Sequence, residues 1–337
     1  MNDFLDTASR DLSVGVDLGG TNLRVALYRG LASARAGERI EPIVQRREPV
    51  GDSREPAVLV NRLGDAVEHM LREAECSEAA LPIGIGFAGM MRGRTGVVAN
   101  APQFAWRDVD LGALVRDRFG PRHHIALVND VNAITVGECS FGAAAGATDV
   151  LAVFVGTGIG GGIIAGGKLI DGADSCAGEI GHSKVVWTDN ARPCGCGAKG
   201  CVEAYLGGRN LQRRARLELR GGARSLAVRL AGTPENVNPG HLDEAASRGD
   251  DYALSLYAEI APYLGVVLAN AVSLLNPSHL VLGGGVLSRT PILKAHVVTA
   301  FEVAVNKPAL ETLQIVDAAL GDDAGLVGSA LVASLGD

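Results

Sequence analysis

The alternation of apolar strands, glycine turns and amphipathic helices along these 337 residues predicts two α/β units in succession. Expected strands of the first unit span 13–17, 23–28, 43–47, 83–87 and 125–128, and its expected helices span 55–75 and 111–119. In the second unit we expect strands at 150–155, 162–165, 168–170, 279–282 and 312–316, and helices at 131–141, 210–218, 242–248, 252–275, 291–303 and 323–335. The β-hairpin followed by a helix recurs in both units, which suggests a rough internal duplication.

This order of elements predicts two domains. We expect a smaller α/β domain over residues 1–127 together with about 318–337, and a larger one over 128–317. The larger domain includes a loop at 176–206 that is too rich in glycine for regular structure.

Composition and charge narrow the classes of partner. The net charge of −7 argues against a nucleic-acid-binding surface, which needs a basic face. The N-terminus lacks the basic and apolar regions of a secretion signal. The most apolar stretch, 260–275, contains Pro262 and is expected to be too short to span a bilayer. Because Cys76, Cys139 and Cys176 are scattered like reduced core thiols, we expect a cytoplasmic protein without a membrane partner.

Four candidate metal ligands share one short span of the chain: His182, Cys194, Cys196 and Cys201. This set and spacing are typical of a structural Cys3His zinc site, so zinc is the expected metal. The alternative, three unrelated buried thiols, leaves the spacing and the surrounding glycines unexplained. Glu179 precedes the histidine and Glu203 follows the last cysteine, so a bound metal would also fix two carboxylates.

A glycine turn between the first two strands is a candidate anion site. Its residues are Asp17, Gly19, Gly20, Thr21 and Asn22. Glycines let backbone N–H groups approach an anion, and Thr21 adds a hydroxyl donor. Asp17, at the end of the strand, could hold a metal ion through water. A tight hairpin without any ligand is the alternative interpretation.

A second glycine loop follows the apolar strand at 150–155. It contains Gly156, Thr157, Gly158, Gly160 and Gly161. The spacing G-x-G-x-x-G is present, but the residues after it indicate another strand where the dinucleotide fingerprint requires a helix. We therefore interpret this loop as a second phosphate-binding hairpin. With the turn at Gly283 and Gly284, the two hairpins suggest a nucleotide held in a cleft between the domains.

Asn129 and Asp130 directly follow the strand at 125–128. A carboxylate at the carboxyl end of a strand is well placed to accept a proton from a hydroxyl. Asp is also a favoured residue at a helix N-cap. From these residues alone, Asp130 is either a general base or a cap.

Six motifs in this order resemble those of the ROK family of repressors and sugar kinases over nearly the whole chain. They are Asp17-x-Gly-Gly-Thr21, Asn129-Asp130-x-Asn132-Ala133, Gly156-Thr-Gly-x-Gly-Gly-Gly162, Glu179-Ile-Gly-His182, Cys194-x-Cys196-Gly-x-x-Gly-Cys201-x-Glu203 and Gly283-Gly284-Gly285. Within the family they are most similar to those of bacterial ATP-dependent glucokinases. The resemblance implies a two-lobed actin-like ATPase (ribonuclease H-like) fold with an interdomain cleft and a zinc-binding loop.

The same resemblance implies roles for individual residues. Asp130 would be the catalytic base that takes the proton from the sugar 6-hydroxyl. Other hydroxyls of the sugar would be bound by Asn129, Glu179, His182 and Glu203. His182 would use one ring nitrogen for zinc and the other for sugar. The glycine hairpins would bracket the phosphates of ATP, the turn at Gly283 would lie near the adenosine, and Mg²⁺ would neutralise the transferred phosphoryl group.

The chain departs from the family pattern in two loops. Where members often carry a sugar-binding Asn, this chain has Gln103, whose amide lies one methylene further out. Asn100 is therefore a candidate substitute ligand. The usual glycine–proline of the preceding loop is replaced in Gly86-Phe-Ala-Gly89, where Gly89 is a further sugar-binding candidate.

Three functions agree with the motifs to different degrees. We expect a hexose kinase, with glucose first. A kinase of N-acetylglucosamine or N-acetylmannosamine is the alternative, since the pocket around the sugar 2-substituent decides between them. A sugar-responsive repressor is disfavoured, because twelve residues before the first strand leave no room for a helix-turn-helix. The resemblance also implies a homodimer, with sugar and ATP as its small-molecule partners.

Overall fold

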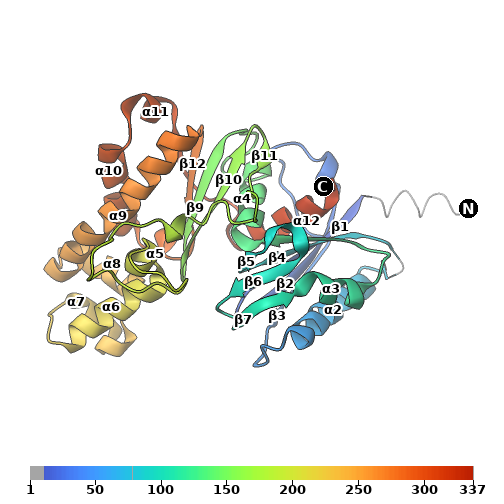
Figure 1. Ribbon diagram of the computed structural model, residues 1–337, viewed down its shortest axis with the longest axis horizontal. Helices are drawn as coiled ribbons and strands as arrows, with labels where there is room; N and C mark the ends of the chain where they lie inside the picture. Colours follow the sequence, from blue (N-terminus) through green and yellow to red (C-terminus); the bar gives the residue numbers. More distant parts are fainter. Residues whose placement is uncertain (1–10, 78, 337) are drawn as a thin grey trace, which may run out of the picture. The chain divides into compact units, whose positions relative to one another are not determined.

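The computed structural model describes residues 11–77 and 79–336. The chain divides into two compact units, whose elements are labelled in Figure 1. One unit comprises Met1–Thr148, Gly162–Ala177 and Ala319–Asp337, and the other comprises Asp149–Gly161 and Gly178–Ala318.

A five-stranded sheet with the order β3-β2-β1-β4-β8 forms the centre of the first unit. Its strands are β1 (Leu12–Leu18), β2 (Asn22–Arg29), β3 (Val44–Pro49), β4 (Pro82–Phe87) and β8 (His124–Asn129). Strands β1, β2 and β3 are antiparallel neighbours, whereas β1, β4 and β8 run parallel. All the strands expected in this unit, and the first hairpin, are confirmed.

Both faces of this sheet are covered, because successive side chains of a strand point to opposite faces. On β2, Leu27 packs into a core that includes residues of α2 (Pro56–Glu73) and α3 (Leu111–Phe119). Its neighbour Tyr28 packs into a separate core with α12 (Ala324–Leu335). The alternation of apolar residues along the strand thus explains the layers of the unit.

Several short elements were not expected from the sequence. A three-stranded sheet has the order β5-β6-β7, with strands Met90–Met91, Val97–Ala101 and Trp106–Asp110. Helices α7 (Leu226–Ala231) and α11 (Lys307–Thr312) are six residues long. Elements this short contain too few residues for a periodic pattern to stand out.

A second five-stranded sheet repeats the strand order of the first, as β11-β10-β9-β12-β13. Its strands are β9 (Val150–Val155), β10 (Ile159–Ala165), β11 (Lys168–Leu169), β12 (His279–Gly283) and β13 (Gln314–Asp317). Here β9, β12 and β13 run parallel, and β10 and β11 are antiparallel. The duplication suggested by the sequence therefore corresponds to a repeated sheet topology.

The larger helices of the second unit agree with the expected ones. They are α6 (Gly208–Arg220), α8 (Pro239–Ser247), α9 (Asp251–Leu275) and α10 (Pro291–Ala304). The loop at 176–206 is more regular than expected, since it contains a 3₁₀ turn at Ile180–His182 and helix α5 (Glu203–Leu206). Two isolated β-bridges, Lys184 with Cys201 and Pro193 with Lys199, also order it.

Helix α9 corrects one expectation. By length and composition alone, this helix of 25 residues could cross a membrane, so the apolar stretch is not too short. Such a helix is weak evidence of a span, because core helices pass the same test. Ile260, Leu264 and Leu268 are fully buried, and a Cβ at Gly265 would lie 2.7 Å from that of Ala300 on α10. These contacts are those of a helix packed in a protein core.

Helix α4 (Asp130–Ser140) packs tightly on α12 within the first unit. A Cβ at Gly328 would lie 1.8 Å from the carbonyl oxygen of Ala133, and one at Gly137 would lie 2.5 Å from that of Ala324. Glycine at both positions lets the two helix backbones approach. The contacts of α4 group it with the first unit.

Glu138 fixes α4 to the segment that leads into α12. The side chain is fully buried, and its carboxylate accepts backbone hydrogen bonds from Ala319, Leu320 and Ala143 at 2.9–3.0 Å. A buried carboxylate needs such partners, since an unpaired charge in the interior is costly. The start of α12 and the middle of α4 are therefore held together.

We expect Glu138→Gln to lower the free energy of unfolding by about 1–3 kcal/mol, because its amide group faces N–H donors that need an acceptor. Urea denaturation at pH 7 measures this loss. Glu302→Gln, on an exposed position of α10, is the matched control and should change stability by less than about 0.5 kcal/mol. Equal stabilities of the two variants would contradict the assigned role.

Candidate functional site

Three strands of the first unit end in one row. The parallel register pairs Leu18 of β1 with Phe87 of β4, and Phe87 with Asn129 of β8. The segments that follow these residues therefore leave the same edge of the sheet. They are the turn at Gly19, the loop at Gly89 and the start of α4 at Asp130, all of which were predicted as site residues. In parallel sheets, ligands bind at this carboxyl edge.

The turn from Gly19 to Thr21 is held by hydrogen bonds to its carbonyl groups. The N–H of Gly19 donates to the carbonyl of Asn22 at 3.0 Å, which closes the turn. The carbonyl of Thr21 accepts from Val50 N–H at 2.9 Å, and that of Gly20 accepts from Arg54 Nη2 at 3.3 Å. Hydrogen bonds to its carbonyl oxygens therefore hold the turn in place.

Asp17 is engaged by a cross-strand partner. Arg24 is its register partner on β2, and both Nε, at 3.0 Å, and Nη2 of Arg24 donate to Asp17 Oδ2. Burial raises the pKa of the Asp17 carboxyl, and the Arg24 guanidinium opposes this rise. Asp17, which was expected to hold a metal ion through water, is therefore already paired with the guanidinium of Arg24. The sequence analysis did not identify Arg24, although the pairing of Leu18 with Leu23 across the turn places it opposite Asp17.

Asn129 is the cap of α4. Its Oδ1 accepts from the N–H groups of Val131 and Asn132 at 2.9 and 3.2 Å. Asp130 is instead the first residue of the helix, and its Oδ1 accepts from Val131 N–H at 2.9 Å. The interpretation of Asp130 as the N-cap is therefore wrong, since its neighbour takes that position. A carboxylate in the first turn is also stabilised by the helix dipole.

The loop after β4 connects the remaining candidates of the first unit. Asn129 Nδ2 donates to the carbonyl of Gly89 at 3.2 Å, and Gln103 Nε2 donates to that of Ala88 at 2.9 Å. A Cβ at Gly89 would lie 2.4 Å from the ring of Phe87, so a larger residue does not fit there. Asn100 lies in β6, whose partners are β5 and β7. Gln103 and Asn129 are thus fixed to one loop, while Asn100 lies on the adjoining sheet.

Stacked aromatic rings support this loop from inside the unit. The ring centroids of Phe104 and Trp106 are 4.9 Å apart, and those of Phe87 and Trp106 are 6.0 Å apart. Trp106 Nε1 also donates to the carbonyl of Arg54 at 2.6 Å. Because Arg54 donates to the turn at Gly20, the aromatic cluster positions that turn as well as the loop at Gly89.

In the second unit, the two glycine segments lie against each other. Strands β9 and β12 are parallel, with Phe154 opposite Gly283, so both segments leave one edge. A Cβ at Gly284 would lie 2.5 Å from the carbonyl oxygen of Val155, and its φ of 88° is accessible mainly to glycine. The N–H of Val286 donates to that same oxygen at 2.8 Å.

The first turn of α6 holds the loop at Gly156. The N–H of Gly208 donates to the carbonyl of Gly156 at 2.9 Å, and that of Arg209 donates to the carbonyl of Thr157 at 3.1 Å. The turn is shorter than expected, because Gly160 and Gly161 already lie in β10.

Glu203 contacts this glycine loop directly. Its Oε2 accepts from Ile159 N–H at 2.8 Å, and a Cβ at Gly158 would lie only 2.4 Å from the same atom. Its Oε1 lies 3.8 Å from Cys194 Sγ. One carboxylate thus contacts both the loop at Gly156 and the cysteine cluster.

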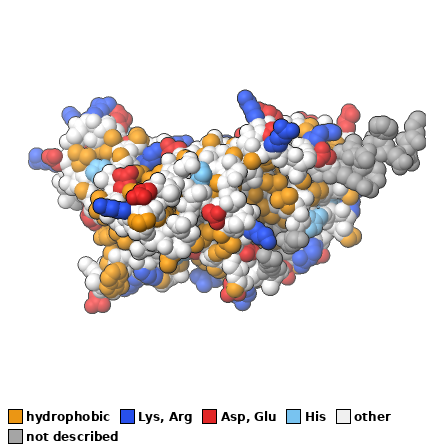
Figure 2. Space-filling model, turned by 90° about the horizontal axis from the view of Figure 1, so that it is seen from above, with side chains coloured by type: hydrophobic (Ala, Val, Ile, Leu, Met, Phe, Trp, Pro, Cys, Tyr) orange, Lys and Arg blue, Asp and Glu red, His pale blue; other side chains and the backbone are white. Residues whose placement is uncertain are grey.

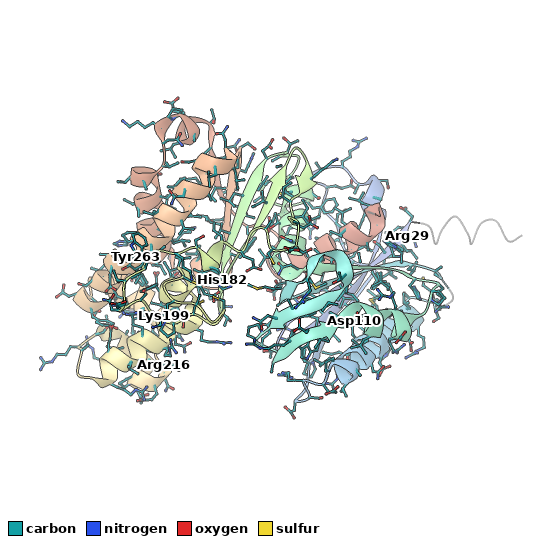
Figure 3. All side chains as sticks on the ribbon, viewed as in Figure 1. Arg29, Asp110, His182, Lys199, Arg216 and Tyr263 are labelled. Carbon is teal, nitrogen blue, oxygen red and sulfur yellow. The ribbon has the colours of Figure 1, made fainter. Side chains whose placement is uncertain are left out.

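The four expected metal ligands come together. The ligand atoms of His182, Cys194, Cys196 and Cys201 all lie within 4.8 Å of one another, and Figure 3 labels His182 in this part of the second unit. Cys196 Sγ lies 3.7 Å from Cys201 Sγ, and His182 Nδ1 lies 3.6 Å from Cys194 Sγ. A tetrahedral ion at about 2.3 Å from sulfur and about 2.0 Å from nitrogen would give edges of about 3.8 and 3.6 Å. The donor set and its spacing therefore fit one tetrahedral metal ion.

Glu179 faces the other nitrogen of the same histidine. Its Oε2 lies 3.7 Å from His182 Nε2. Burial raises the pKa of the Glu179 carboxyl, with His182 opposing the rise and Glu203 adding to it. Glu179, His182 and Glu203 therefore form one polar group beside the cysteines, as their positions in the sequence predicted.

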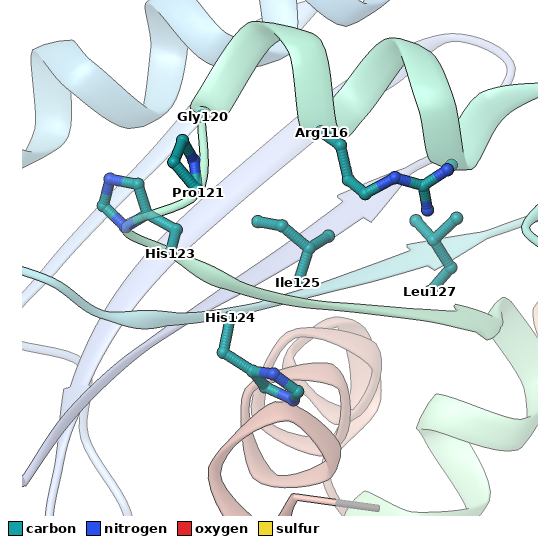
Figure 4. Close-up of a pocket in the computed structure, with 8 residues that line it drawn as sticks. Arg116, Gly120, Pro121, His123, His124, Ile125 and Leu127 are labelled. Atoms are coloured by element: carbon teal, nitrogen blue, oxygen red, sulfur yellow. The ribbon is translucent and has the colours of Figure 1, made fainter.

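A pocket lies elsewhere in the first unit. It encloses about 460 Å³ and is lined by residues of α3, β8 and the segment between them, including Arg116, Pro121 and Ile125 (Figure 4). None of the predicted site residues lines it. On the face shown in Figure 2, acidic and basic side chains are interspersed over the described residues.

Comparisons with known proteins cover almost the whole chain. The ROK family matches residues 13–335. A glucokinase of Thermotoga maritima is 32% identical over 320 residues, which are 95% of this chain and 96% of the relative. A glucokinase of Streptomyces coelicolor is 34% identical over 328 residues, with coverage of 95% and 96%. A solved ROK family glucokinase of Streptomyces griseus, in complex with glucose and AMPPNP, is 32% identical with a TM-score of 0.75, covering 96% of this chain and 100% of that one. This chain belongs to the ROK family.

Proposed function

We propose that this protein is an ATP-dependent glucokinase, which transfers the γ-phosphoryl group of ATP to the 6-hydroxyl of glucose. The observation that carries the proposal is the position of Asp130. It heads α4 at the carboxyl edge of the first sheet, while Asn129 takes the capping role. Full-length similarity to proteins named glucokinase supports the same reaction.

Asp130 is the general base of the proposed mechanism. Its carboxylate accepts the proton of the 6-hydroxyl as the oxygen attacks phosphorus and the bond to the ADP leaving group breaks. Phosphoryl transfer needs alignment and charge neutralisation more than covalent help. The turns at Gly19 and Gly156 bind the ATP phosphates through backbone N–H groups, the turn at Gly283 lies near the adenosine, and Mg²⁺ neutralises the charge of the phosphates.

We propose an actin-like ATPase fold for the chain, and a repeat in its sheets supports this proposal. The strand order of the first sheet recurs in the second, and in each sheet a glycine turn follows the first strand. We propose that Gly19, Gly20, Thr21 and Asn22 act on the phosphates in one half, and Gly156, Thr157 and Gly158 in the other. Asp17 then has an indirect role, because Arg24 occupies its carboxylate.

The sugar is bound by polar side chains with fixed orientations. Its hydroxyls donate to the carboxylates of Glu179 and Glu203. They also form hydrogen bonds with His182 and Asn129. An amide nitrogen carries two hydrogens, so Asn129 Nδ2 keeps one for the sugar while it donates the other to Gly89. Further proposed contacts are those of Gly89, Asn100 and Gln103.

Zinc is the proposed metal of the cysteine cluster. His182, Cys194, Cys196 and Cys201 would hold it, and with four protein ligands it would order the loop rather than take part in bond chemistry. If His182 bound the metal through Nδ1, its Nε2 would carry the proton and could donate towards Glu179 or a sugar hydroxyl.

We further propose a cytoplasmic homodimer that associates through the second unit. Large apolar side chains are exposed on its helices, with Leu274 of α9 85% exposed and Val303 of α10 83% exposed. Exposed apolar side chains are typical of an interface with another chain where they form one contiguous patch.

Asp130→Asn should lower kcat for glucose about 10²–10⁴-fold, because the amide cannot accept the proton. Glucose affinity and metal content should stay close to those of the parent. Steady-state kinetics and calorimetric titration of glucose measure both. Asp251→Asn, at the equivalent first position of α9, is the matched control and should be fully active. A kcat for Asp130→Asn within tenfold of the parent would mean that another group is the base.

A second candidate function is that of an N-acylhexosamine kinase, because the side chain of Gln103 is longer than the Asn usual at this position. The preference for one sugar over another distinguishes the two functions. We expect kcat/KM for glucose to exceed that for N-acetylglucosamine and N-acetylmannosamine by about tenfold or more, since a close pocket discriminates against an added group by this factor. A coupled assay for ADP with the three sugars decides. A higher kcat/KM for either N-acetylated sugar would favour the second candidate.

Cys196→Ser should lose bound zinc and glucose affinity together, because the loop that carries Glu203 is ordered by the cluster. Elemental analysis gives the metal content, and calorimetry gives the dissociation constant for glucose, expected to rise about tenfold or more. Cys176→Ser, at an exposed cysteine outside the cluster, serves as the control. Normal glucose affinity in a zinc-free Cys196→Ser protein would disprove the ordering role.

A further inference from the structure

The register of the cysteine loop places Lys184 beside Cys201. The two residues form an isolated antiparallel bridge. The N–H of Val185 donates to the carbonyl of Gly200, and that of Val202 donates to the carbonyl of Ser183, both at 2.9 Å. Lys184 and Cys201 are therefore a non-hydrogen-bonded pair, in which opposing side chains lie close together on one face.

The ammonium group of Lys184 uses this position to contact the cluster. Its Nζ donates to Cys201 Sγ at 2.9 Å and to the carbonyl of Lys199 at 2.9 Å. Cys201 is fully buried, whereas Lys184 is exposed, so the lysine reaches a buried sulfur from the protein surface. Two acceptors fix one end of the side chain in a defined place.

Charge balance gives this contact a consequence. Three thiolates and a neutral imidazole around a divalent ion leave a net charge of −1, since the cysteines bind metal as thiolates. The carboxylate of Glu203, 3.8 Å from Cys194 Sγ, adds to the negative charge. A buried charge is costly unless it is paired, and the ammonium of Lys184 supplies the opposite charge at the thiolate.

We propose that Lys184 is a positioning residue of the metal centre, which sets the zinc affinity through its charge-assisted hydrogen bond to Cys201. This inference rests on the proposed zinc site and adds a residue outside its four ligands. Hydrogen bonds to metal ligands affect metal affinity 10–100-fold in order of magnitude. Because Glu203 follows Cys201 by two residues, the same contact steadies the start of α5.

The test compares Lys184→Met, Lys184→Arg and Lys199→Met in the full-length protein. The methionine removes charge and donor but keeps the length of the side chain, and arginine restores both. Lys199 contributes its carbonyl rather than its ammonium to the contact, so Lys199→Met removes the same charge from the same loop without touching Cys201. The dissociation constant for zinc is measured by competition with a chromogenic chelator, with thermal melts to check folding.

Lys184→Met should bind zinc about tenfold more weakly or worse, with Lys184→Arg close to the parent and Lys199→Met unchanged. The inference is overturned if Lys184→Met matches the parent, or if Lys199→Met loses as much affinity. Either of these two results would refute the role of Lys184 without contradicting the proposed zinc site. A parent protein that binds no zinc would instead refute the proposed metal, and the role of Lys184 with it.

Discussion

Parallel pairing of β1, β4 and β8 is the constraint on which the candidate site of the first unit depends. It aligns Leu18, Phe87 and Asn129 in one row, so three loops distant in sequence leave the sheet side by side. The turn at Gly19 supplies backbone N–H groups, the loop at Gly89 supplies carbonyl groups, and the start of α4 supplies the carboxylate of Asp130. A one-residue slip of β8 would turn Asn129 and its neighbours to the other face and separate Asp130 from the turn at Gly19.

The second sheet applies the same constraint with a different outcome. Parallel pairing of β9 with β12 brings the turns at Gly156 and Gly284 into contact, and glycine is required there because backbone atoms of Val155 leave no space for a side chain. A site lined by backbone rather than side chains suits an anion with many oxygens. The side-chain chemistry of this unit is concentrated instead at Glu179, His182 and Glu203.

Sequence patterns predicted the features that depend on neighbours along the chain. The strands, the long helices and the cysteine cluster follow from periodicity and spacing, and the structure contains them. The pairs Asp17–Arg24 and Lys184–Cys201 depend on cross-strand register, which periodicity does not specify. The identity of the N-cap depends on the residue at which α4 begins, and the sequence pattern does not fix that position to within one residue. The strands β5 to β7 escaped prediction because they are short, and β7 also carries charged residues.

The proposed zinc would act on catalysis without taking part in bond breaking, by ordering the cysteine loop. Part of the loop is exposed, since Trp187 is 83% exposed and a Cβ at Gly195 or Gly197 would meet nothing within 4 Å, whereas Cys194 and Cys201 lie in a small buried core. Besides the cluster, Tyr205 restrains it, accepting from Arg192 N–H at 3.0 Å while the guanidinium of Arg192 lies over its ring. Glu203 lies two residues after Cys201, and its carboxylate also accepts from Ile159 N–H at 2.8 Å. Its position therefore depends both on the glycine loop and on what fixes Cys201, which in the proposed zinc site would be the metal together with Lys184.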